Sequence, residues 1–203
     1  SRITDAVDFY SHTRTIESIE RCDVVVHLID AGAGLTETDK KISDEIMKAR
    51  KPVIIAVNKW DLIEKDHRTF DTFIDRLKFQ FYKANDFPII SISAKHKQRL
   101  NRIIDKSLDL KERASRKIET PRLNRIMAQV QSSRRIPQLQ SSIKIYYATQ
   151  TDTMPPRFKI FVNNPEHFRK DIVRYFEKSL QKELDLEGIP IDIQIEGKKK
   201  KKK

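Results

Sequence analysis

The sequence contains little cysteine and glycine and no long apolar run. One cysteine, Cys22, and four glycines occur among 203 residues. A single cysteine excludes an intrachain disulfide framework and a cysteine-rich zinc site, and it is typical of a reducing compartment. The longest apolar runs, Val24–Val26 and Pro52–Val57, are far too short to cross a bilayer. No apolar targeting segment opens the chain, and we therefore expect a cytoplasmic protein with no membrane partner.

Basic residues outnumber acidic ones, which gives a formal net charge of +12. The last segment of the sequence, Lys198–Lys203, consists only of lysine and supplies half of this excess. Such a tail attracts phosphate backbones without specificity, and the attraction weakens as salt increases. The net charge alone therefore does not establish nucleic-acid binding.

Three short apolar segments alternate with amphipathic helical patterns in residues 1–117. Nearly continuous apolar runs of this kind, rich in β-branched residues, are typical of strands buried on both faces of a parallel sheet. The expected strands are Val24–Asp30, Pro52–Val57 and Phe87–Ile92. Helical spacing of apolar residues follows each strand, and a further amphipathic helix over Ile3–Arg21 precedes the first. The alternation predicts an α/β fold with a parallel sheet covered on both faces.

A different pattern begins at residue 118. The expected elements are a helix from Thr120, strands over Ile143–Thr149 and Arg157–Val162, a helix from Asn163 to a Gly188 C-cap, and a strand over Ile189–Ile195. This order predicts an α+β domain with its helices on one face of a small sheet. We expect Tyr146 and Tyr147 to point to opposite faces, one into the core and one outward. The predicted domains are thus 1–117 and 118–197, followed by the lysine tail 198–203.

Polar turns follow two of the predicted strands at their carboxyl ends, where ligands of open parallel sheets bind. A carboxylate such as Asp61 can accept hydrogen bonds from both N1–H and the N2 amino group of guanine. Adenine has no donor at N1, so the same carboxylate would be left unpaired. We predict a guanine site formed by Asn58, Lys59, Asp61, Ser93, Ala94 and Lys95.

The other residues of these turns have separate expected roles. Asn58 can bridge the two loops or meet the purine edge, Lys59 can lay its methylenes along the base plane, and a backbone N–H near Ala94 can donate to O6. Trp60 is expected to pack rather than to stack on the base, and Asp30 to cap the loop after its strand. The alternative is an ordinary polar turn, because Asn, Asp and Lys are common turn residues.

At these two turns the chain resembles translation-factor-class GTPases, and longer stretches resemble the Der (EngA) GTPase family. These stretches are Ile3–Val7, Thr120–Met127, Lys144–Gln150 and Pro155–Asn163. The resemblance covers the whole chain except the lysine tail. It implies three carboxy-terminal strands of a P-loop GTPase sheet, followed by a KH-like domain. It also implies a monomer in large ribosomal subunit assembly, with rRNA or that subunit and GTP or GDP as partners.

The sequence lacks the phosphate-binding part of such a GTPase. Phosphates require a Gly-x-x-x-x-Gly-Lys-Ser/Thr loop, and none occurs; the family's Asp-x-x-Gly segment would precede Ser1. We therefore assign no catalytic residue and no metal ligand, expect Mg²⁺ only in the intact protein, and expect this polypeptide alone not to hydrolyse GTP. Without the neighbouring strand, Val24–Ile29 is expected to form an unpaired apolar edge.

The KH-like resemblance also has a departure, because no Gly-x-x-Gly loop for gripping RNA occurs. The candidate RNA surface is instead a positive patch, with the alternative that it is a solvated face with interdomain salt bridges. The patch comprises Arg122, Arg125, Arg134, Arg135 and Lys144, with Lys111, Arg113, Arg116 and Lys117 in the preceding helix.

Two other interpretations stay open. The chain could be a non-enzymatic module that docks to RNA or the ribosome and has a vestigial base site. An Era-like GTPase is a weaker alternative, disfavoured by the missing Gly-x-x-Gly loop. Lys97 stands where the Der family usually has glycine, so this turn must either avoid positive φ or carry strain.

Overall fold

The computed structural model describes residues 13–64, 68–81, 85–132 and 143–197. The chain divides into two compact units, Ser1–Lys111 and Glu112–Lys203. Several sequence predictions fall on residues outside the described ranges. These are the start of the first helix, the cations Arg134 and Arg135, and the lysine tail.

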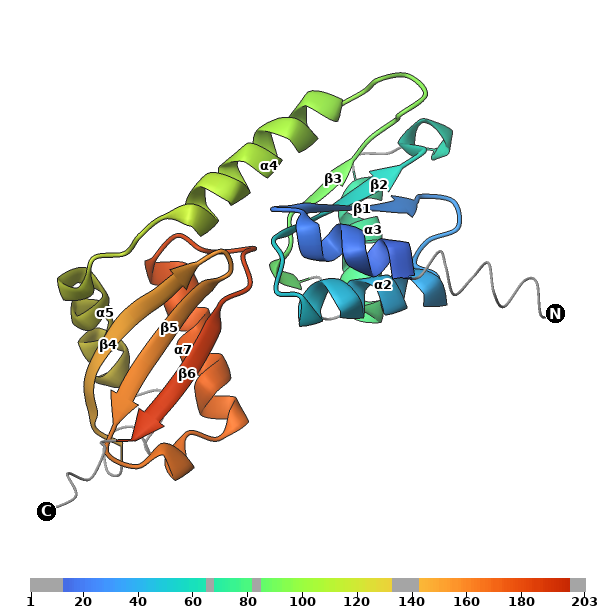
Figure 1. The fold of residues 1–203 in the computed structure, drawn as a ribbon. Coiled ribbons are helices and arrows are strands. Elements are labelled where there is room, and N and C mark those ends of the chain that lie inside the picture. Colours follow the sequence, from blue (N-terminus) through green and yellow to red (C-terminus); the bar gives the residue numbers. More distant parts are fainter. Residues whose placement is uncertain (1–12, 65–67, 82–84, 133–142, 198–203) are drawn as a thin grey trace, which may run out of the picture. The chain divides into compact units, whose positions relative to one another are not determined.

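Unit 1 is built on a parallel three-stranded sheet in the order β1-β2-β3 (Figure 1). The strands are β1 (Val25–Asp30), β2 (Val53–Asn58) and β3 (Ile89–Ser91). The other elements are α2 (Glu37–Lys48), the 3-10 helix η1 (Trp60–Leu62), α3 (Thr69–Gln80) and α4 (Leu100–Ser115), which continues into unit 2. Residues 13–21 are also helical. The strand–helix alternation and the parallel pairing confirm the predicted fold class.

The central strand β2 is apolar because it is buried on both faces. Val57 lies in the core with Ile46 of α2 and Leu77 of α3 on one face. Ile54 and Ala56, which point to the other face, are also 0% exposed. Each fully buried aliphatic side chain of this size stabilises the fold by about 1.5–3 kcal/mol relative to an exposed one.

The strand β1 is an edge of this sheet, since it pairs only with β2 within the described part of the chain. Its Leu28 is 55% exposed. A cavity of about 780 Å³ runs along the strand and is lined in part by Arg14, Ser18 and Val24. The expectation of an apolar edge strand is therefore confirmed.

Helix α2 begins with a capping box that is connected to β1. Thr36 is the N-cap, its side chain accepting from the Asp39 amide while Asp39 Oδ2 accepts from the Thr36 amide at 2.9 Å. Asp39 Oδ1 lies 3.3 Å from Nε2 of the buried His27 on β1, and Ser43 Oγ lies 3.5 Å from His27 Nδ1. Burial acts to raise the pKa of Asp39, but hydrogen bonds from Thr36 and His27 outweigh it, so the pKa is lowered.

Replacing Asp39 by asparagine is expected to lower the free energy of unfolding of unit 1 by about 1 kcal/mol at pH 7. Because the folded-state pKa of Asp39 is lowered, its charge stabilises the native state above the unfolded-state pKa, and this contribution is lost as pH falls below about 4. Urea unfolding followed by Trp60 fluorescence measures this. The parent should lose more stability than Asp39→Asn between pH 7 and pH 3; equal losses would contradict the account.

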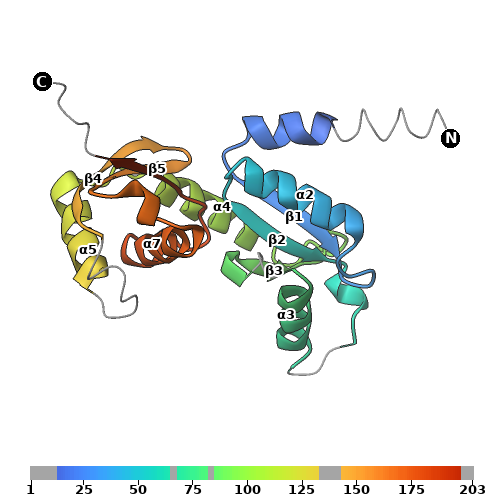
Figure 2. The ribbon, with the colours of Figure 1, turned by 90° about the horizontal axis from the view of Figure 1, so that it is seen from below.

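Unit 2 is a three-stranded sheet with two helices on one face (Figures 1 and 2). Strand β5 (Pro156–Val162) lies between β4 (Ile145–Thr153), which is antiparallel to it, and β6 (Asp192–Gly197), which is parallel. The helices are α5 (Thr120–Ser132) and α7 (Lys170–Glu183), and the 3-10 helix η3 (Pro165–His167) precedes α7. The predicted α-β-β-α-β order is confirmed, although α7 begins later than Asn163.

Side-chain amides of α5 satisfy the outer backbone edge of β4. Asn124 Oδ1 accepts from the Ala148 amide and Asn124 Nδ2 donates to the Ala148 carbonyl, both at 2.8 Å. At the other end of α5, Gln131 binds the Ile143 carbonyl and the Ile145 amide. Because Ala148 is 0% exposed, these side chains provide bonds that water cannot.

The two tyrosines of β4 are not divided between the faces, and the prediction that one is buried is wrong. Tyr146 is 44% exposed and Tyr147 is 47% exposed. The ladder between β4 and β5 shifts register between Ile145 and Tyr147. Such an irregularity adds a residue to one strand and breaks strict alternation, which leaves both rings outside the core.

Gly188 does not cap α7, contrary to the prediction. The helix ends at Glu183 with Leu184 as its C-cap, and Asp185 takes the left-handed conformation with φ 56°. The Leu186 amide then donates to the Gln181 carbonyl at 2.7 Å, as in a Schellman motif. Gly188, at φ 79°, lies in the turn that follows. Aspartate is among the few residues besides glycine that tolerate this conformation.

Removing the Asn124 side chain is expected to destabilise unit 2. Asn124→Ala leaves a buried N–H and a buried C=O of Ala148 without partners, at a cost of about 2–4 kcal/mol. Amide hydrogen exchange around residue 148 should accelerate accordingly. Gln129→Ala, which removes an exposed amide from the same helix, is the matched control and should change little. Unaltered protection in Asn124→Ala would show that β4 does not depend on this bond.

Candidate functional site

The carboxyl ends of the three strands of unit 1 carry polar residues that the fold brings to one edge. In the parallel register, Asp30 of β1 is opposite Asn58 of β2, and Val57 is opposite Ser91 of β3. The turns after β2 and β3 therefore leave the sheet side by side, as the sequence predicted.

A side-chain hydrogen bond joins these two turns. The Ala94 amide donates to Asn58 Oδ1 at 3.0 Å. The Trp60 amide donates to the Ile92 carbonyl at 3.0 Å, so a backbone hydrogen bond also connects the two turns. Asn58 thus has the loop-bridging role expected of it. The Ala94 N–H, which the sequence suggested for purine O6, is already engaged by this side chain.

Packing of the Trp60 side chain against α3 anchors the turn after β2. Its side chain is 4% exposed, and its ring makes edge contacts with Phe70 and Phe73 of α3 at 5.4 and 5.5 Å between centroids. Edge-to-face geometry of this kind adds about 0.5–1.5 kcal/mol to the burial itself. The expectation that Trp60 packs rather than stacks on a base is confirmed.

Asp61 lies in η1 directly after Trp60 and is a charged, largely covered carboxylate. Its side chain is 15% exposed, and Nε2 of His96 lies 3.6 Å from Oδ2. A hydrogen bond from Ser93 is the largest cause lowering the pKa of Asp61, opposed by burial and assisted by the nearby charges of His96 and Lys95. Oδ1 is buried and has no hydrogen-bond partner among the described residues. The carboxylate therefore has an acceptor that the protein does not use.

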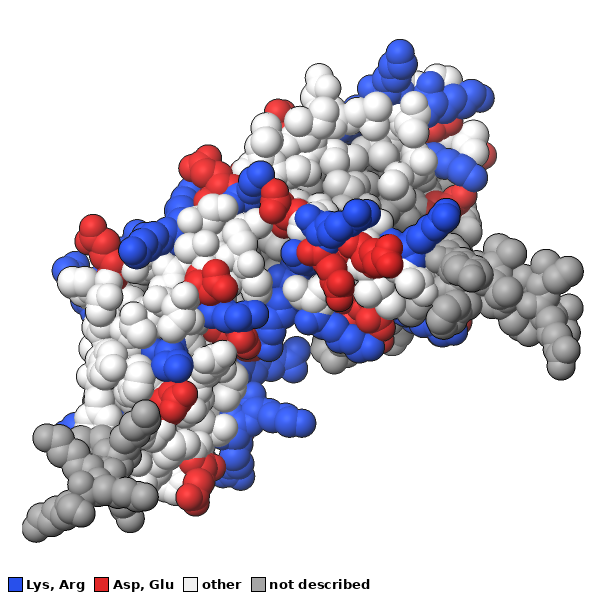
Figure 3. Space-filling model, viewed as in Figure 1, with Lys and Arg blue, Asp and Glu red and all other residues white. Residues whose placement is uncertain are grey.

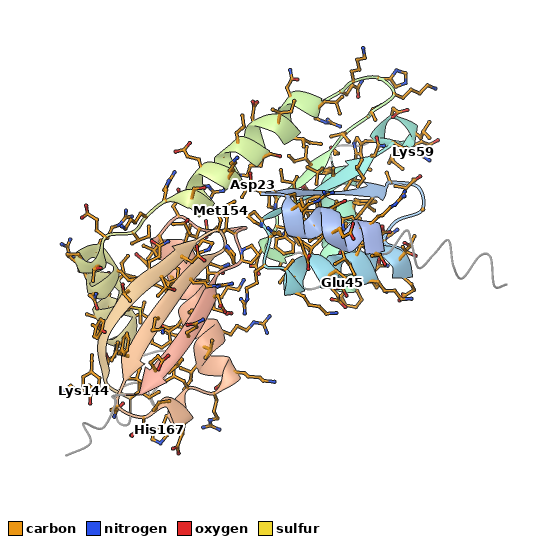
Figure 4. All side chains as sticks on the ribbon, in the orientation of Figure 1. Asp23, Glu45, Lys59, Lys144, Met154 and His167 are labelled. Atoms are coloured by element: carbon orange, nitrogen blue, oxygen red, sulfur yellow. The ribbon has the colours of Figure 1, made fainter. Side chains whose placement is uncertain are left out.

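Lys59 is held at the mouth of the site by Asp30. Its Nζ lies 2.7 Å from Asp30 Oδ2, and Figure 4 shows Lys59 beyond the end of β2. The other carboxylate oxygen of Asp30 accepts from the amides of Gly32 at 2.8 Å and Ala33 at 3.3 Å. The bond to Lys59 is the largest cause lowering the pKa of Asp30, and the same contact raises the pKa of Lys59.

For Asp30, sequence reasoning favoured the loop-capping role over a functional role at the end of its strand, and it gave His96 no role. The structure confirms the cap and adds a lysine partner 29 positions further along the chain. The position of Asp30 at the carboxyl end of a parallel strand was the sequence feature that could have indicated a place in the site. Nothing in the spacing of the five histidines marked His96.

The turn after β3 contains left-handed residues that are not glycine. Lys97 has φ 53° and Arg99 has φ 60°. The sequence left open whether the turn at Lys97 avoids positive φ or carries strain. The structure shows positive φ, which costs about 1–2 kcal/mol for a residue other than glycine. The turn is closed by the Gln98 amide bonded to the Ser93 carbonyl at 2.9 Å and by the His96 amide bonded to Ser93 Oγ at 3.1 Å. Ser93 is 0% exposed, whereas the side chain of Lys95 is exposed.

The cavity along β1 is lined by none of the predicted site residues. A second cavity of about 480 Å³ lies between residues 31–35 and α3. Within the described ranges, no three His, Cys, Asp or Glu side chains are grouped to hold a metal ion. No described helix is both long enough and apolar enough to span a membrane.

The predicted cations of unit 2 divide into two groups. Arg113 is 6% exposed and donates to the Asp185 and Glu187 carbonyls at 3.2 and 3.3 Å, and Arg116 binds Asp185 Oδ2 at 3.1 Å. These two arginines hold the segment after α7. Lys111 of unit 1 pairs with Asp23 at 2.7 Å.

The remaining described cations of the patch are exposed. Arg122 and Arg125 lie on α5 and Lys144 precedes β4. The bonds of Asn124 and Gln131 hold α5 beside β4, the strand that Lys144 precedes. Arg134 and Arg135 lie outside the described residues.

Two protein families match different segments of the chain. Residues 6–132 match the family described as the elongation factor Tu GTP binding domain. Residues 117–196 match the KH-domain-like family of EngA bacterial GTPase enzymes, C-terminal. A solved structure of Era from Aquifex aeolicus covers 90% of this chain and 68% of its own, at 19% identity and a TM-score of 0.41.

Curated relatives named GTPase Der match nearly the whole chain. The protein from Leptospira interrogans is 38% identical over 202 residues, which are 98% of this chain and 41% of the relative. That from Sulfurihydrogenibium is 38% identical over 203 residues, 100% of this chain and 45% of the relative. The chain thus spans less than half the length of these relatives. Together with the two strand-end turns and the second α/β unit, these matches show that the chain belongs to the Der (EngA) family of GTPases.

Proposed function

We propose that unit 1 is the base-recognition half of a GTP-binding site in a ribosome-assembly GTPase, and that Asp61 selects guanine. The observation that carries this proposal is the carboxylate of Asp61, which Ser93 holds with a lowered pKa and whose Oδ1 has no hydrogen-bond partner among the described residues. An ionised carboxylate is the group that accepts two adjacent N–H donors.

Guanine fits the residues around this carboxylate. Its N1–H and N2 amino group would donate to Asp61, and the base would take the place of the half-exposed His96 ring beside Oδ2. Lys59, held by Asp30, would lay its methylenes along the base plane. The purine O6 would share the Ala94 amide with Asn58 or bind a neighbouring amide of the same turn. Adenine would present a lone pair to Asp61 at N1.

The residues of this chain do not fit the phosphates or Mg²⁺ of GTP. No Gly-x-x-x-x-Gly-Lys-Ser/Thr loop occurs in the sequence. We therefore assign to this chain the selection of the base and no step of hydrolysis. Hydrolysis, Mg²⁺ binding and a role with the large ribosomal subunit belong to the proposal for the intact family protein, which we place in the cytoplasm as a monomer.

Unit 2 supports a second candidate function, docking to RNA or the ribosome without catalysis. Helix α5 carries Arg122 and Arg125 and contains no acidic residue. Asn124 and Gln131 hold this helix beside β4, the strand that the exposed Lys144 precedes. Exposed arginines on one edge suit the phosphate backbone of rRNA, which positions a protein without reading sequence. Both functions can reside in one chain, because they use different units.

The substitution Asp61→Asn is expected to change the preferred base. It exchanges an acceptor for a donor, so it should weaken GDP binding about a hundredfold and favour xanthosine diphosphate, which has an oxygen where guanine has an amino group. Saturation-transfer NMR with GDP, ADP and xanthosine diphosphate measures the relative binding. Asp75→Asn, on the exposed surface of α3, is the control and should keep the parent order of preference. Equal binding of GDP and ADP by the parent chain would contradict the assignment.

Charge reversal on α5 tests the docking function. The double variant Arg122→Glu, Arg125→Glu should bind purified large ribosomal subunits about tenfold more weakly at moderate salt, and with a shallower salt dependence, because it removes two phosphate contacts. Arg102→Glu changes an exposed arginine of unit 1 and serves as the control. Co-sedimentation over a salt series measures both effects. If the α5 variant sediments like the control, this edge does not dock RNA.

A further inference from the structure

The carboxylate of Asp61 is in contact with a histidine of the neighbouring turn. Nε2 of His96 lies 3.6 Å from Asp61 Oδ2, and the His96 side chain is 51% exposed whereas that of Asp61 is 15% exposed. Asp61 Oδ1 is buried and has no hydrogen-bond partner among the described residues. Both oxygens are needed to accept from N1–H and the N2 amino group of guanine. The imidazole ring therefore lies at an oxygen that one of these two donors has to reach.

The backbone of His96 is held in place, so its ring can move while the turn does not. The His96 amide donates to Ser93 Oγ at 3.1 Å. Ser93 and Gln98 form an isolated bridge through two backbone hydrogen bonds of 2.9 and 3.3 Å, which close the turn on either side of His96. Rotation about the side-chain bonds of His96 can thus carry the half-exposed ring away from Asp61 into solvent.

The other charged groups at this edge of unit 1 keep their charge between pH 5 and pH 8. Lys59 Nζ lies 2.7 Å from Asp30 Oδ2, and this contact raises the pKa of Lys59 and lowers the pKa of Asp30. Lys95 and Lys97 precede and follow His96 and are exposed, and lysine side chains ordinarily lose their proton only near pH 10. Figure 3 shows basic and acidic side chains close together at the end of unit 1 where Figure 4 labels Lys59.

The strength of the contact between His96 and Asp61 depends on the charge of the ring. The hydrogen bond from Ser93 is the largest cause lowering the pKa of Asp61, so this carboxyl stays ionised above pH 5. Histidine is the side chain whose charge ordinarily changes between pH 5 and pH 8. An imidazolium both donates to a carboxylate and attracts it by charge, whereas a neutral imidazole lacks the attraction. The contact therefore becomes stronger as the pH falls.

We propose that His96 is an internal competitor of guanine at Asp61, and that protonation of its ring lowers the affinity of the base site. In acid the imidazolium pairs with the carboxylate, and a guanine base has to break this pair before both oxygens accept its N–H groups. At higher pH the neutral ring is held less strongly, and the base binds more tightly. The proposal rests on the guanine site proposed above and names the residue that regulates it.

Chemical-shift titration of the backbone amides with guanosine, at pH 8 and at about pH 5.5, tests the proposal. Guanosine is the probe because it has no phosphate whose own charge changes in this range. The parent chain should bind guanosine about threefold more weakly at the lower pH, as expected for an ion pair at a protein surface.

Two variants assign this pH dependence to one ring. His96→Gln cannot acquire a charge, so it should bind guanosine equally at both pH values. His167→Gln is the matched control, because it removes an exposed histidine of unit 2. It should keep the threefold change of the parent chain.

A measurement without ligand separates the contact between His96 and Asp61 from the recognition of guanine. The NMR signal of the Asp61 carboxyl carbon should move between the same two pH values in the parent chain, because the charge of the adjacent ring changes. The signal should stay in place in His96→Gln and should move in His167→Gln as it does in the parent.

Each contrary result has its own meaning. Equal guanosine affinity at both pH values in the parent, with guanosine still preferred to adenosine, would overturn the competition and leave the base site intact. A pH dependence or a carboxyl signal shift in His96→Gln equal to that of the parent would assign the effect to another group and so overturn the proposal. Equal binding of guanosine and adenosine by the parent at pH 8 would overturn the proposed function, and this proposal with it.

Discussion

The parallel pairing of β2 with both of its neighbours is the constraint on which the candidate site depends. It places the ends of β1, β2 and β3 at one edge, and the bond from the Ala94 amide to Asn58 Oδ1 then joins two of the turns. The contact between Lys59 and Asp30 joins the third. Asp61 is fixed between these connections, with Trp60 buried beneath it. A slip in the pairing of β2 would separate all of these groups.

In both units an asparagine side chain forms hydrogen bonds with the backbone of a neighbouring segment. Asn58 accepts from the turn after β3, and Asn124 binds both backbone groups of Ala148. An amide can donate and accept at once, which suits it to an edge where no further strand is paired. In unit 1 this bond joins the turn that precedes Asp61 to the turn after β3, and in unit 2 the corresponding bonds align a basic helix with a strand that bears aromatic rings. Asparagine–backbone hydrogen bonds thus position the strand-end turns of unit 1 and helix α5 of unit 2.

The sequence was sufficient for the features that depend on local pattern. The order of strands and helices and the packing of Trp60 followed from periodicity and turn position, and the loop bridge by Asn58 was one of the two roles that its turn position allowed. The edge character of β1 followed from the resemblance to a GTPase sheet that has a further strand. Features that depend on distant partners did not. The register shift that exposes both Tyr146 and Tyr147 arises from pairing with β5, and Asp185 rather than Gly188 ends α7 because aspartate tolerates the left-handed conformation there. The turns that carry Asp61 and His96 were predicted to be neighbours, but the approach of the His96 ring to Asp61 depends on the path of the turn after β3, which the sequence did not predict.

The central claim is that Asp61 and the two turns around it recognise guanine. Its most direct test is a map of backbone amide chemical shifts in the chain, recorded with GDP and with ADP. The account predicts that GDP perturbs residues 58–61 and 93–96 and that ADP leaves them unchanged. Perturbations elsewhere in the chain, or the same response to both nucleotides, would contradict it.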